Sequence, residues 1–136
     1  MAETLNELVG RARAAQAHAY APYSGFRVGA ALETGRGTVY TGCNIENASY
    51  GMTMCAERVA IGNAVTAGDR DFTRMILVTD AVTPASPCGA CRQVIAEFAP
   101  ELDIISVAPD GAQARWRASA LLPARFELQP GTGSSA

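Results

Sequence analysis

Two short runs that contain cysteine constrain this chain more than any other part of its sequence. They are Cys-Ala-Glu-Arg at positions 55–58 and Pro-Cys-Gly-Ala-Cys-Arg at positions 87–92. Zinc binds thiolate sulfur well, and a catalytic zinc site uses three protein ligands with one position left open. We therefore expect Cys55, Cys88 and Cys91 to hold one Zn²⁺, which requires a fold that brings the two runs together. Glu57 lies two residues after the first thiolate, where a carboxylate can transfer protons beside the metal.

Both runs fall where the hydrophobic spacing predicts that a helix begins, over residues 55–66 and 88–98. The positive end of a helix favours thiolate over thiol. Three thiolates and one Zn²⁺ still sum to a charge of −1, so a cationic side chain near the sulfurs would improve the site as a Lewis acid. We assign this role to Arg58, as an outer-shell partner of the metal; a solvated surface arginine is the alternative.

Two other uses of the cysteines must be weighed. A structural zinc site is closed by four ligands, and the fourth here would be Cys43 or His18. Cys88 and Cys91 could instead form a redox dithiol, since they have the CxxC spacing near a βαβ pattern. A closed site leaves Glu57 without a role, and a redox dithiol does not need a third thiolate, so an open zinc site is favoured.

The remaining pattern predicts alternating helices and strands. Thr4 is a predicted N-cap with Glu7 as its capping-box partner, and glycines at 25, 29 and 42 predict a bulge or a close backbone approach. The expected elements are a helix over 4–20, a hairpin of strands 26–33 and 38–44 with a turn at 34–37, an irregular loop over 44–53, strands over 74–79, 103–107 and 112–118, and a helical turn over 120–124.

The helix over 88–98 lies between two apolar strands, which predicts a βαβ unit with parallel strands. The order of elements favours an α/β fold, a three-layer α/β/α sandwich with one mixed sheet of about five strands. We expect a single domain over residues 1–128. The small, polar stretch 129–136 is predicted to be a disordered tail.

Charge and hydropathy exclude several classes of function. The net charge of −2 provides no basic field for nucleic acid, and no apolar run is long enough to span a membrane. The N-terminus lacks the basic and apolar regions of a signal peptide, so a cytoplasmic location is expected. Thiols stay reduced there, which suits metal ligands better than disulfides.

These motifs resemble those of cytidine deaminases, specifically the short homotetrameric type with three cysteine ligands. The resemblance runs from residue 21 to residue 126. Besides the run at 55–58, it rests on Phe-Arg-Val-Gly-Ala-Ala at 26–31, Gly-Cys-Asn-Ile-Glu-Asn-Ala-Ser-Tyr-Gly at 42–51 and Ser-Pro-Cys-Gly-Ala-Cys-Arg-Gln at 86–93.

The resemblance implies zinc-dependent hydrolytic deamination of cytidine and deoxycytidine in pyrimidine salvage, by a homotetramer with sites shared between subunits. It implies that Glu57 shuttles protons, that Phe26 packs against the nucleoside and that the Ala56 backbone contacts the pyrimidine. It also implies that three residues reach a neighbouring subunit's site, namely Ala48, Tyr50 and Phe126. Phe126 taken alone could equally be an ordinary core aromatic.

The resemblance assigns Asn44 and Glu46 to the ribose, and their chemistry supports this separately. An extended Asn-x-Glu segment presents both side chains on one face. Vicinal hydroxyls suit a carboxylate acceptor together with an amide that donates and accepts. The alternative is an asparagine that forms a turn and a solvated glutamate. Such buried sugar contacts favour a free pyrimidine nucleoside as partner over a nucleic acid or a membrane.

Two other functions remain open. The same zinc chemistry could act on another substrate, such as the cytosine nucleoside antibiotic blasticidin S or a nucleic acid. The Asn-x-Glu pair argues against the antibiotic, because the antibiotic deaminases lack it. The chain could also be a non-catalytic zinc-binding module, which metal analysis and a test for ammonia release would distinguish.

Overall fold

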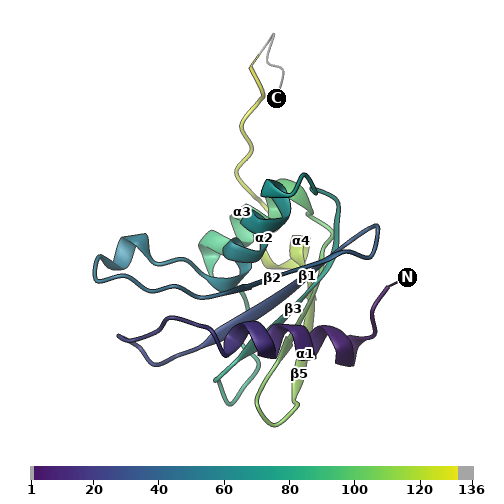
Figure 1. The fold of residues 1–136 in the computed structure, drawn as a ribbon. Helices are drawn as coiled ribbons and strands as arrows, with labels where there is room; N and C mark the ends of the chain where they lie inside the picture. Colours follow the sequence, from purple (N-terminus) through teal and green to yellow (C-terminus); the bar gives the residue numbers. More distant parts are fainter. Residues whose placement is uncertain (1, 132–136) are drawn as a thin grey trace.

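The computed structural model describes residues 2–131, and its centre is one five-stranded sheet (Figure 1). Its strands are β1 (Val28–Thr34), β2 (Val39–Cys43), β3 (Phe72–Thr79), β4 (Asp103–Val107) and β5 (Gln113–Arg117). The order across the sheet is β2-β1-β3-β4-β5, and β3 and β4 are parallel whereas all other neighbours are antiparallel. The predicted hairpin, the parallel pair of the βαβ unit and the mixed five-stranded sheet are all confirmed.

Helices cover both faces of this sheet. Figure 1 shows α1 (Leu5–Gln16) on one side, and α2 (Ala56–Thr66) and α3 (Gly89–Phe98) on the other. Two separate apolar clusters reflect this arrangement: one joins α1 to the sheet, and the other joins α2, α3 and the short α4 (Ala118–Leu121) to the opposite face. The three-layer sandwich predicted from the sequence is therefore correct.

The first helix begins as predicted but ends earlier. Thr4 accepts a hydrogen bond from the Glu7 amide, and the Glu7 side chain accepts one from the Thr4 amide, which completes the capping box. The helix stops at Gln16 rather than continuing to Tyr20. The reason is tertiary, because the Tyr20 backbone pairs with the segment after β2: its amide donates to Asn44, and its carbonyl accepts from Glu46.

Two strand glycines allow helices to approach the sheet closely. A Cβ atom at Gly29 would lie 2.0 Å from the Ala12 carbonyl oxygen of α1, and one at Gly42 would lie 2.5 Å from the Ala56 carbonyl oxygen of α2. Close approach was therefore the correct alternative at both positions. The one register shift of β1 lies at Glu33 and Thr34 instead, and Gly25 is in a loop at φ 70°.

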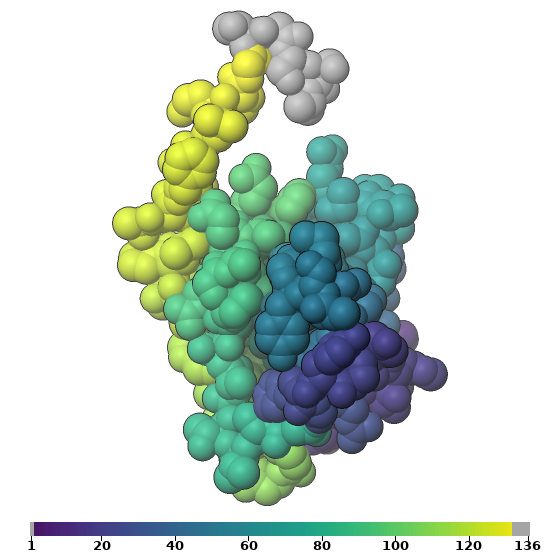
Figure 2. All heavy atoms as spheres, turned by 90° about the vertical axis from the view of Figure 1, so that its left-hand side faces the viewer, coloured from purple at the N-terminus to yellow at the C-terminus, as the bar shows by residue number. Residues whose placement is uncertain are grey.

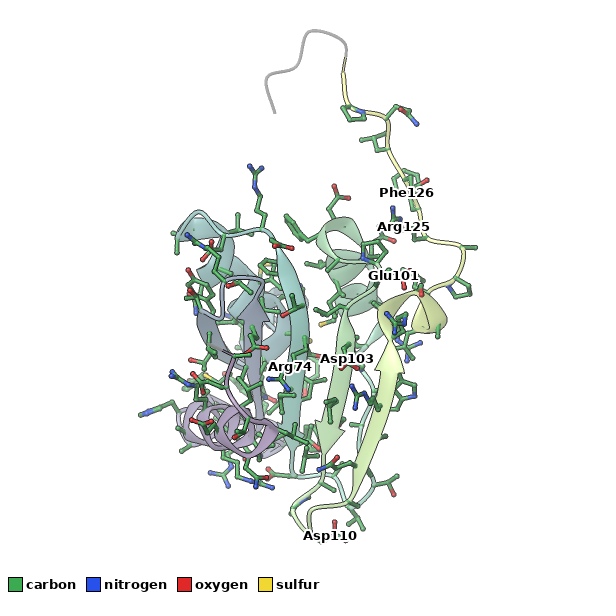
Figure 3. The ribbon with its side chains drawn as sticks, turned by 90° about the vertical axis from the view of Figure 1, so that its right-hand side faces the viewer. Arg74, Glu101, Asp103, Asp110, Arg125 and Phe126 are labelled. Atoms are coloured by element: carbon green, nitrogen blue, oxygen red, sulfur yellow. The ribbon has the colours of Figure 1, made fainter. Side chains whose placement is uncertain are left out.

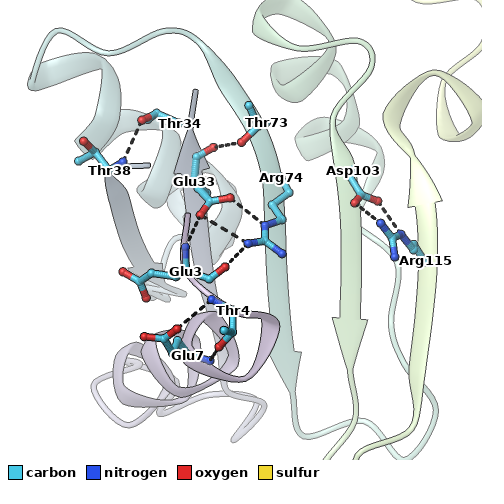
Figure 4. A network of polar contacts seen from close by, with 10 residues as sticks. All are labelled: Glu3, Thr4, Glu7, Glu33, Thr34, Thr38, Thr73, Arg74, Asp103 and Arg115. Atoms are coloured by element: carbon cyan, nitrogen blue, oxygen red, sulfur yellow. Dashed lines mark hydrogen bonds and ion pairs between the residues drawn. The ribbon is translucent and has the colours of Figure 1, made fainter. Parts of the chain in front are cut away.

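An ion pair fixes the N-terminal end of α1 to the sheet (Figure 4). Arg74 Nε donates to Glu33 Oε1 at 2.8 Å, and its Nη2 donates to the Glu3 carbonyl. The Glu3 amide donates to Glu33 Oε2 at 3.1 Å. The hydrogen bond from Arg74 holds the pKa of the buried Glu33 carboxyl below its usual value, so this network contributes to stability at neutral pH.

The C-terminal part also departs from the expected boundaries. β5 is an edge strand, and α4 follows it directly and begins before the predicted turn at 120–124. The segment 122–131 contains no helix or strand and runs away from α4, carrying Arg125 and Phe126 (Figure 3). The predicted disordered tail 129–136 lies outside the described residues from position 132 onward. Within residues 2–131, no helix is long and apolar enough to cross a membrane.

Candidate metal centre and substrate pocket

The fold brings the three predicted metal ligands together. The sulfur of Cys88 lies 3.8 Å from that of Cys55 and 3.4 Å from that of Cys91, and all three fall within 4.8 Å of one another. Three sulfurs bound to one tetrahedral zinc would be about 3.8 Å apart, given the Zn–S length. The donor set and its spacing therefore fit zinc. Among the described residues, neither Cys43 nor His18 joins this cluster, which argues against a site closed by four ligands.

The sulfurs owe their positions to two helix starts. Cys55 is the N-cap of α2 and Cys88 is the N-cap of α3, and neither thiol is used to cap its own helix. Cys91 follows in the first turn of α3 and is buried. Two helices thus direct their positive ends at one point, where anionic sulfur is favoured.

Arg58 lies beside the sulfurs, as expected from the sequence. Its Nη2 atom is 3.7 Å from Cys55 Sγ and donates to the Thr53 carbonyl at 3.2 Å. A hydrogen bond from the Cys91 thiol and the contact with Arg58 lower the pKa of Cys55 to about 5. The hydrogen bond with Cys55 and burial raise the pKa of the Cys91 thiol. Coordination to a metal would deprotonate the thiols outright.

A pocket of about 220 Å³ opens beside the cysteines. Three predicted substrate contacts line it, Phe26, Asn44 and Ala56. Its other lining residues were not predicted from the sequence, although most of them directly precede one of the cysteine runs or lie at the ends of β1 and β3. They are Val28, Thr53, Met54, Leu77, Thr79, Ala85 and Ser86.

Glu57 lines the same pocket as Cys55 and Cys88. It lies in the first turn of α2, and only 6% of its surface is exposed. Burial raises the pKa of the Glu57 carboxyl to about 7. A carboxyl group with a pKa near the working pH can both accept and donate a proton, which is the property that general acid–base chemistry requires.

Asn44 and Glu46 both hold the loop that precedes β1. Asn44 Oδ1 accepts from the Val28 amide at 2.9 Å, and its Nδ2 donates to the Phe26 carbonyl at 2.8 Å. Glu46 is 8% exposed and accepts from the amides of Tyr23 and Ser24 and from the Ser24 hydroxyl. The solvated-glutamate alternative is therefore wrong. Glu46 is not among the residues that line the pocket.

The three residues expected to serve a neighbouring subunit lie outside the pocket of their own chain. Tyr50 is 68% exposed and Phe126 is 69% exposed, so the alternative of a core aromatic at position 126 is wrong. Ala48 is exposed as well. Figure 2 shows the blue segment around η1 (Tyr50–Met52) standing out beside the indigo segment near residues 20–26, and a bridge between Tyr20 and Ile45 joins the two segments.

Comparisons with known proteins agree on one family. The family model for the cytidine and deoxycytidylate deaminase zinc-binding region matches residues 2–106. A cytidine deaminase of Sporosarcina psychrophila is 54% identical over 94 residues, which are 69% of each chain. A probable cytidine deaminase of Dictyostelium discoideum is 41% identical over 128 residues, 93% of this chain and 86% of the other. The crystal structure of a cytidine deaminase from Burkholderia pseudomallei superposes with a TM-score of 0.89 at 46% identity, covering 91% of this chain and all of the other.

Proposed function

Because the chain belongs to the cytidine and deoxycytidylate deaminase family, we propose that it removes the C4 amino group of cytidine and deoxycytidine by hydrolysis. One water molecule is consumed, and the products are ammonia with uridine or deoxyuridine. The role is pyrimidine salvage in the cytoplasm, where thiols stay reduced and available to a metal. The observation that carries this proposal is the shared pocket of the cysteine cluster and Glu57.

Cys55, Cys88 and Cys91 would hold zinc, and Arg58 beside Cys55 would offset the negative charge of the three sulfurs. Zinc bound in such a site would lower the pKa of a water molecule, which would make a nucleophile available at neutral pH. The positive ends of α2 and α3 and the Arg58 guanidinium support this chemistry by drawing electron density from the sulfurs.

Glu57 moves the protons. It takes the proton of the attacking water and delivers it to N3 of the ring, which makes C4 more electrophilic. It then carries the proton of the new C4 hydroxyl to the amine, so that ammonia leaves as a neutral molecule. The buried position of Glu57 suits both steps, because a carboxyl with a pKa of about 7 gains and loses a proton with little free-energy cost.

Asn44 and Glu46 bind the ribose, and Phe26 and the Ala56 backbone bind the base. The hydrogen-bonding capacity of the two polar side chains supports this assignment. Asn44 keeps one amide hydrogen and one lone pair beyond its two contacts with the 26–28 backbone. Glu46 accepts three hydrogen bonds out of about four available lone pairs, so it can accept one from a sugar hydroxyl.

The active assembly is a homotetramer in which each pocket is completed by neighbouring chains. Exposed large hydrophobic side chains on two segments that the Tyr20–Ile45 bridge joins support this, because neighbouring exposed apolar groups often mark an interface. They are Tyr20, Tyr23, Ile45, Tyr50 and Met52, all on the segments in view in Figure 2. Ala48, Tyr50 and Phe126 would complete a neighbour's pocket.

An absorbance assay tests the activity. Cytidine and deoxycytidine should be converted, activity should vanish on removal of zinc with a chelator and return with added Zn²⁺, and blasticidin S should be a poor substrate. The variant Cys88→Ala should lose zinc by elemental analysis. Zinc binding without ammonia release from any of the three compounds would instead identify a non-catalytic zinc module.

A mixing experiment tests the shared pocket. Chains carrying Glu57→Gln are co-assembled with chains carrying Phe126→Ala, each of them nearly inactive alone. If Phe126 acts across an interface, some mixed assemblies pair an intact Glu57 with an intact Phe126 from a neighbour, and activity returns. Mixed tetramers verified by mass that stay inactive would mean that Phe126 does not complete a neighbour's pocket.

A further inference from the structure

Arg92 joins three parts of the chain through one guanidinium group. It lies in the second turn of α3, and its Nε donates to the Pro87 carbonyl at 2.7 Å. Its Nη2 donates to the Ser86 hydroxyl at 2.9 Å, and its Nη1 donates to the Leu121 carbonyl at the end of α4 at 3.1 Å. Pro87 and Ser86 belong to the loop before α3, and Ser86 also lines the pocket, whereas Leu121 belongs to α4.

Two of these acceptors immediately precede the candidate ligand Cys88. Pro87 is fully buried, and Ser86 lines the pocket together with Cys88. Cys88 itself is exposed, and its thiol does not cap its helix. The path of the chain into Cys88 is therefore held by the side chain of Arg92 as well as by the backbone of α3.

The third acceptor begins a further set of contacts between α3 and the C-terminal segment. Gln93 Nε2 donates to the Phe126 carbonyl at 3.0 Å, and Arg125 Nη1 donates to the Ala96 carbonyl at 2.7 Å. Figure 3 shows Arg125 and Phe126 on the segment that leaves the body of the molecule beyond α4. Arg92 is the member of this set that also contacts the loop before Cys88.

We propose that Arg92 is a positioning residue that fixes the approach of Cys88 to the metal and ties it to the C-terminal segment. The proposal rests on the proposed function, in which Cys88 is a zinc ligand. A guanidinium is planar and presents donors in fixed directions, so it can satisfy three acceptors in a defined arrangement. An ammonium on a flexible stem cannot reproduce that arrangement.

Zinc affinity, measured by competition with a chromogenic chelator, tests the proposal without depending on turnover. Removal of outer partners of a metal typically lowers affinity by about 10–100-fold, so Arg92→Gln should weaken zinc binding by at least about tenfold. The matched control is Arg125→Gln, which also breaks a bond between α3 and the C-terminal segment but touches no residue next to Cys88. Its zinc affinity should equal that of the parent.

Thermal unfolding of the metal-free proteins separates positioning from a general structural role. If Arg92 only stabilises the fold, both variants lower the melting temperature and zinc affinity is unchanged in both, which would overturn the proposal. If Arg92→Gln does not fold, Arg92→Lys is measured instead, because lysine keeps the positive charge but lacks the planar set of guanidinium donors. Parental zinc affinity in the folded lysine variant would overturn the proposal as well.

Hydrogen exchange tests the link to the C-terminal segment. In Arg92→Gln the amides of residues 85, 86 and 88 and those of residues 122 and 124–126 should both exchange faster, whereas Arg125→Gln should affect the second group alone. Unchanged exchange at 85–88 in Arg92→Gln would contradict the proposed role. Failure of the proposed function gives a different result, since the parent would then bind no zinc or Cys88→Ala would retain it.

Discussion

Replacing Gly42 by alanine should disturb the metal site by displacing the start of α2. A Cβ atom at this position would lie 2.5 Å from both the Ala56 carbonyl oxygen and the Ala60 amide nitrogen. Both neighbours are helix backbone, which cannot rotate away as a side chain can. Ordinary contact therefore requires the first turn of α2 to retreat from β2 by about 1 Å. That turn carries Glu57 and directly follows Cys55.

The size of the effect follows from this displacement. Overpacking in a well-packed core costs about 1–3 kcal/mol, and a clash with backbone belongs at the upper end of that range. A misplacement of about 1 Å in a catalytic group can reduce turnover by about 10²-fold. We therefore expect Gly42→Ala to lower the urea midpoint and to reduce both zinc occupancy and kcat, measured at a temperature where the variant is fully folded.

Gly29→Ala is the matched control. Its Cβ atom would lie 2.0 Å from the Ala12 carbonyl oxygen, so the strain falls on α1, on the face of the sheet opposite α2. This variant should lose at least as much stability while its folded fraction keeps zinc and turnover. If the folded fraction of Gly42→Ala has parental turnover, or if Gly29→Ala loses turnover to the same extent, the argument from helix displacement is refuted.

Three further perturbations follow from the site and the N-terminal network. Glu57→Gln should keep zinc and fold, by elemental analysis and circular dichroism, while kcat falls at least about 10²-fold because the amide cannot cycle a proton; turnover within about tenfold of the parent would contradict the role of Glu57. Glu46→Gln should raise the KM for cytidine far more than that for free cytosine, and equal losses on both compounds would mean that Glu46 only holds the loop at residues 23–24. The lowered pKa of Glu33, caused first by the hydrogen bond from Arg74, means that its stabilising contribution is complete above the pKa of the unfolded state and is lost as pH falls through the lower pKa of the folded state. Urea midpoints measured from pH 7 downward should therefore decline less steeply in Glu33→Gln than in the parent, and parallel declines would contradict this linkage.

The sequence alone was sufficient wherever the signal is local. Thr4 and Glu7 predicted the helix start, and the position of a cysteine just before a helical pattern placed Cys55 and Cys88 at their caps. Such signals depend on a few neighbouring residues and on the periods of helix and strand, which are properties of the chain itself. The strand–helix–strand order then fixed the parallel pair, because the connection geometry leaves few alternatives.

The tertiary structure decided what depends on residues distant in sequence. The end of α1 at Gln16 follows from pairing between Tyr20 and the segment after β2, and no local signal marks it. Arg92 donates to acceptors that lie both before and after α3 in the sequence. A motif cannot specify which acceptors will face its guanidinium.

Burial is the clearest case of this division. The spacing of Cys55 and Glu57 placed a carboxylate beside a thiolate, but the raised pKa of Glu57 arises because the packed core removes that carboxyl from water. The sequence therefore determined which chemical groups are present and roughly where each lies along its helix or strand. The fold determined their solvation and their distances, because both depend on every segment that packs around them.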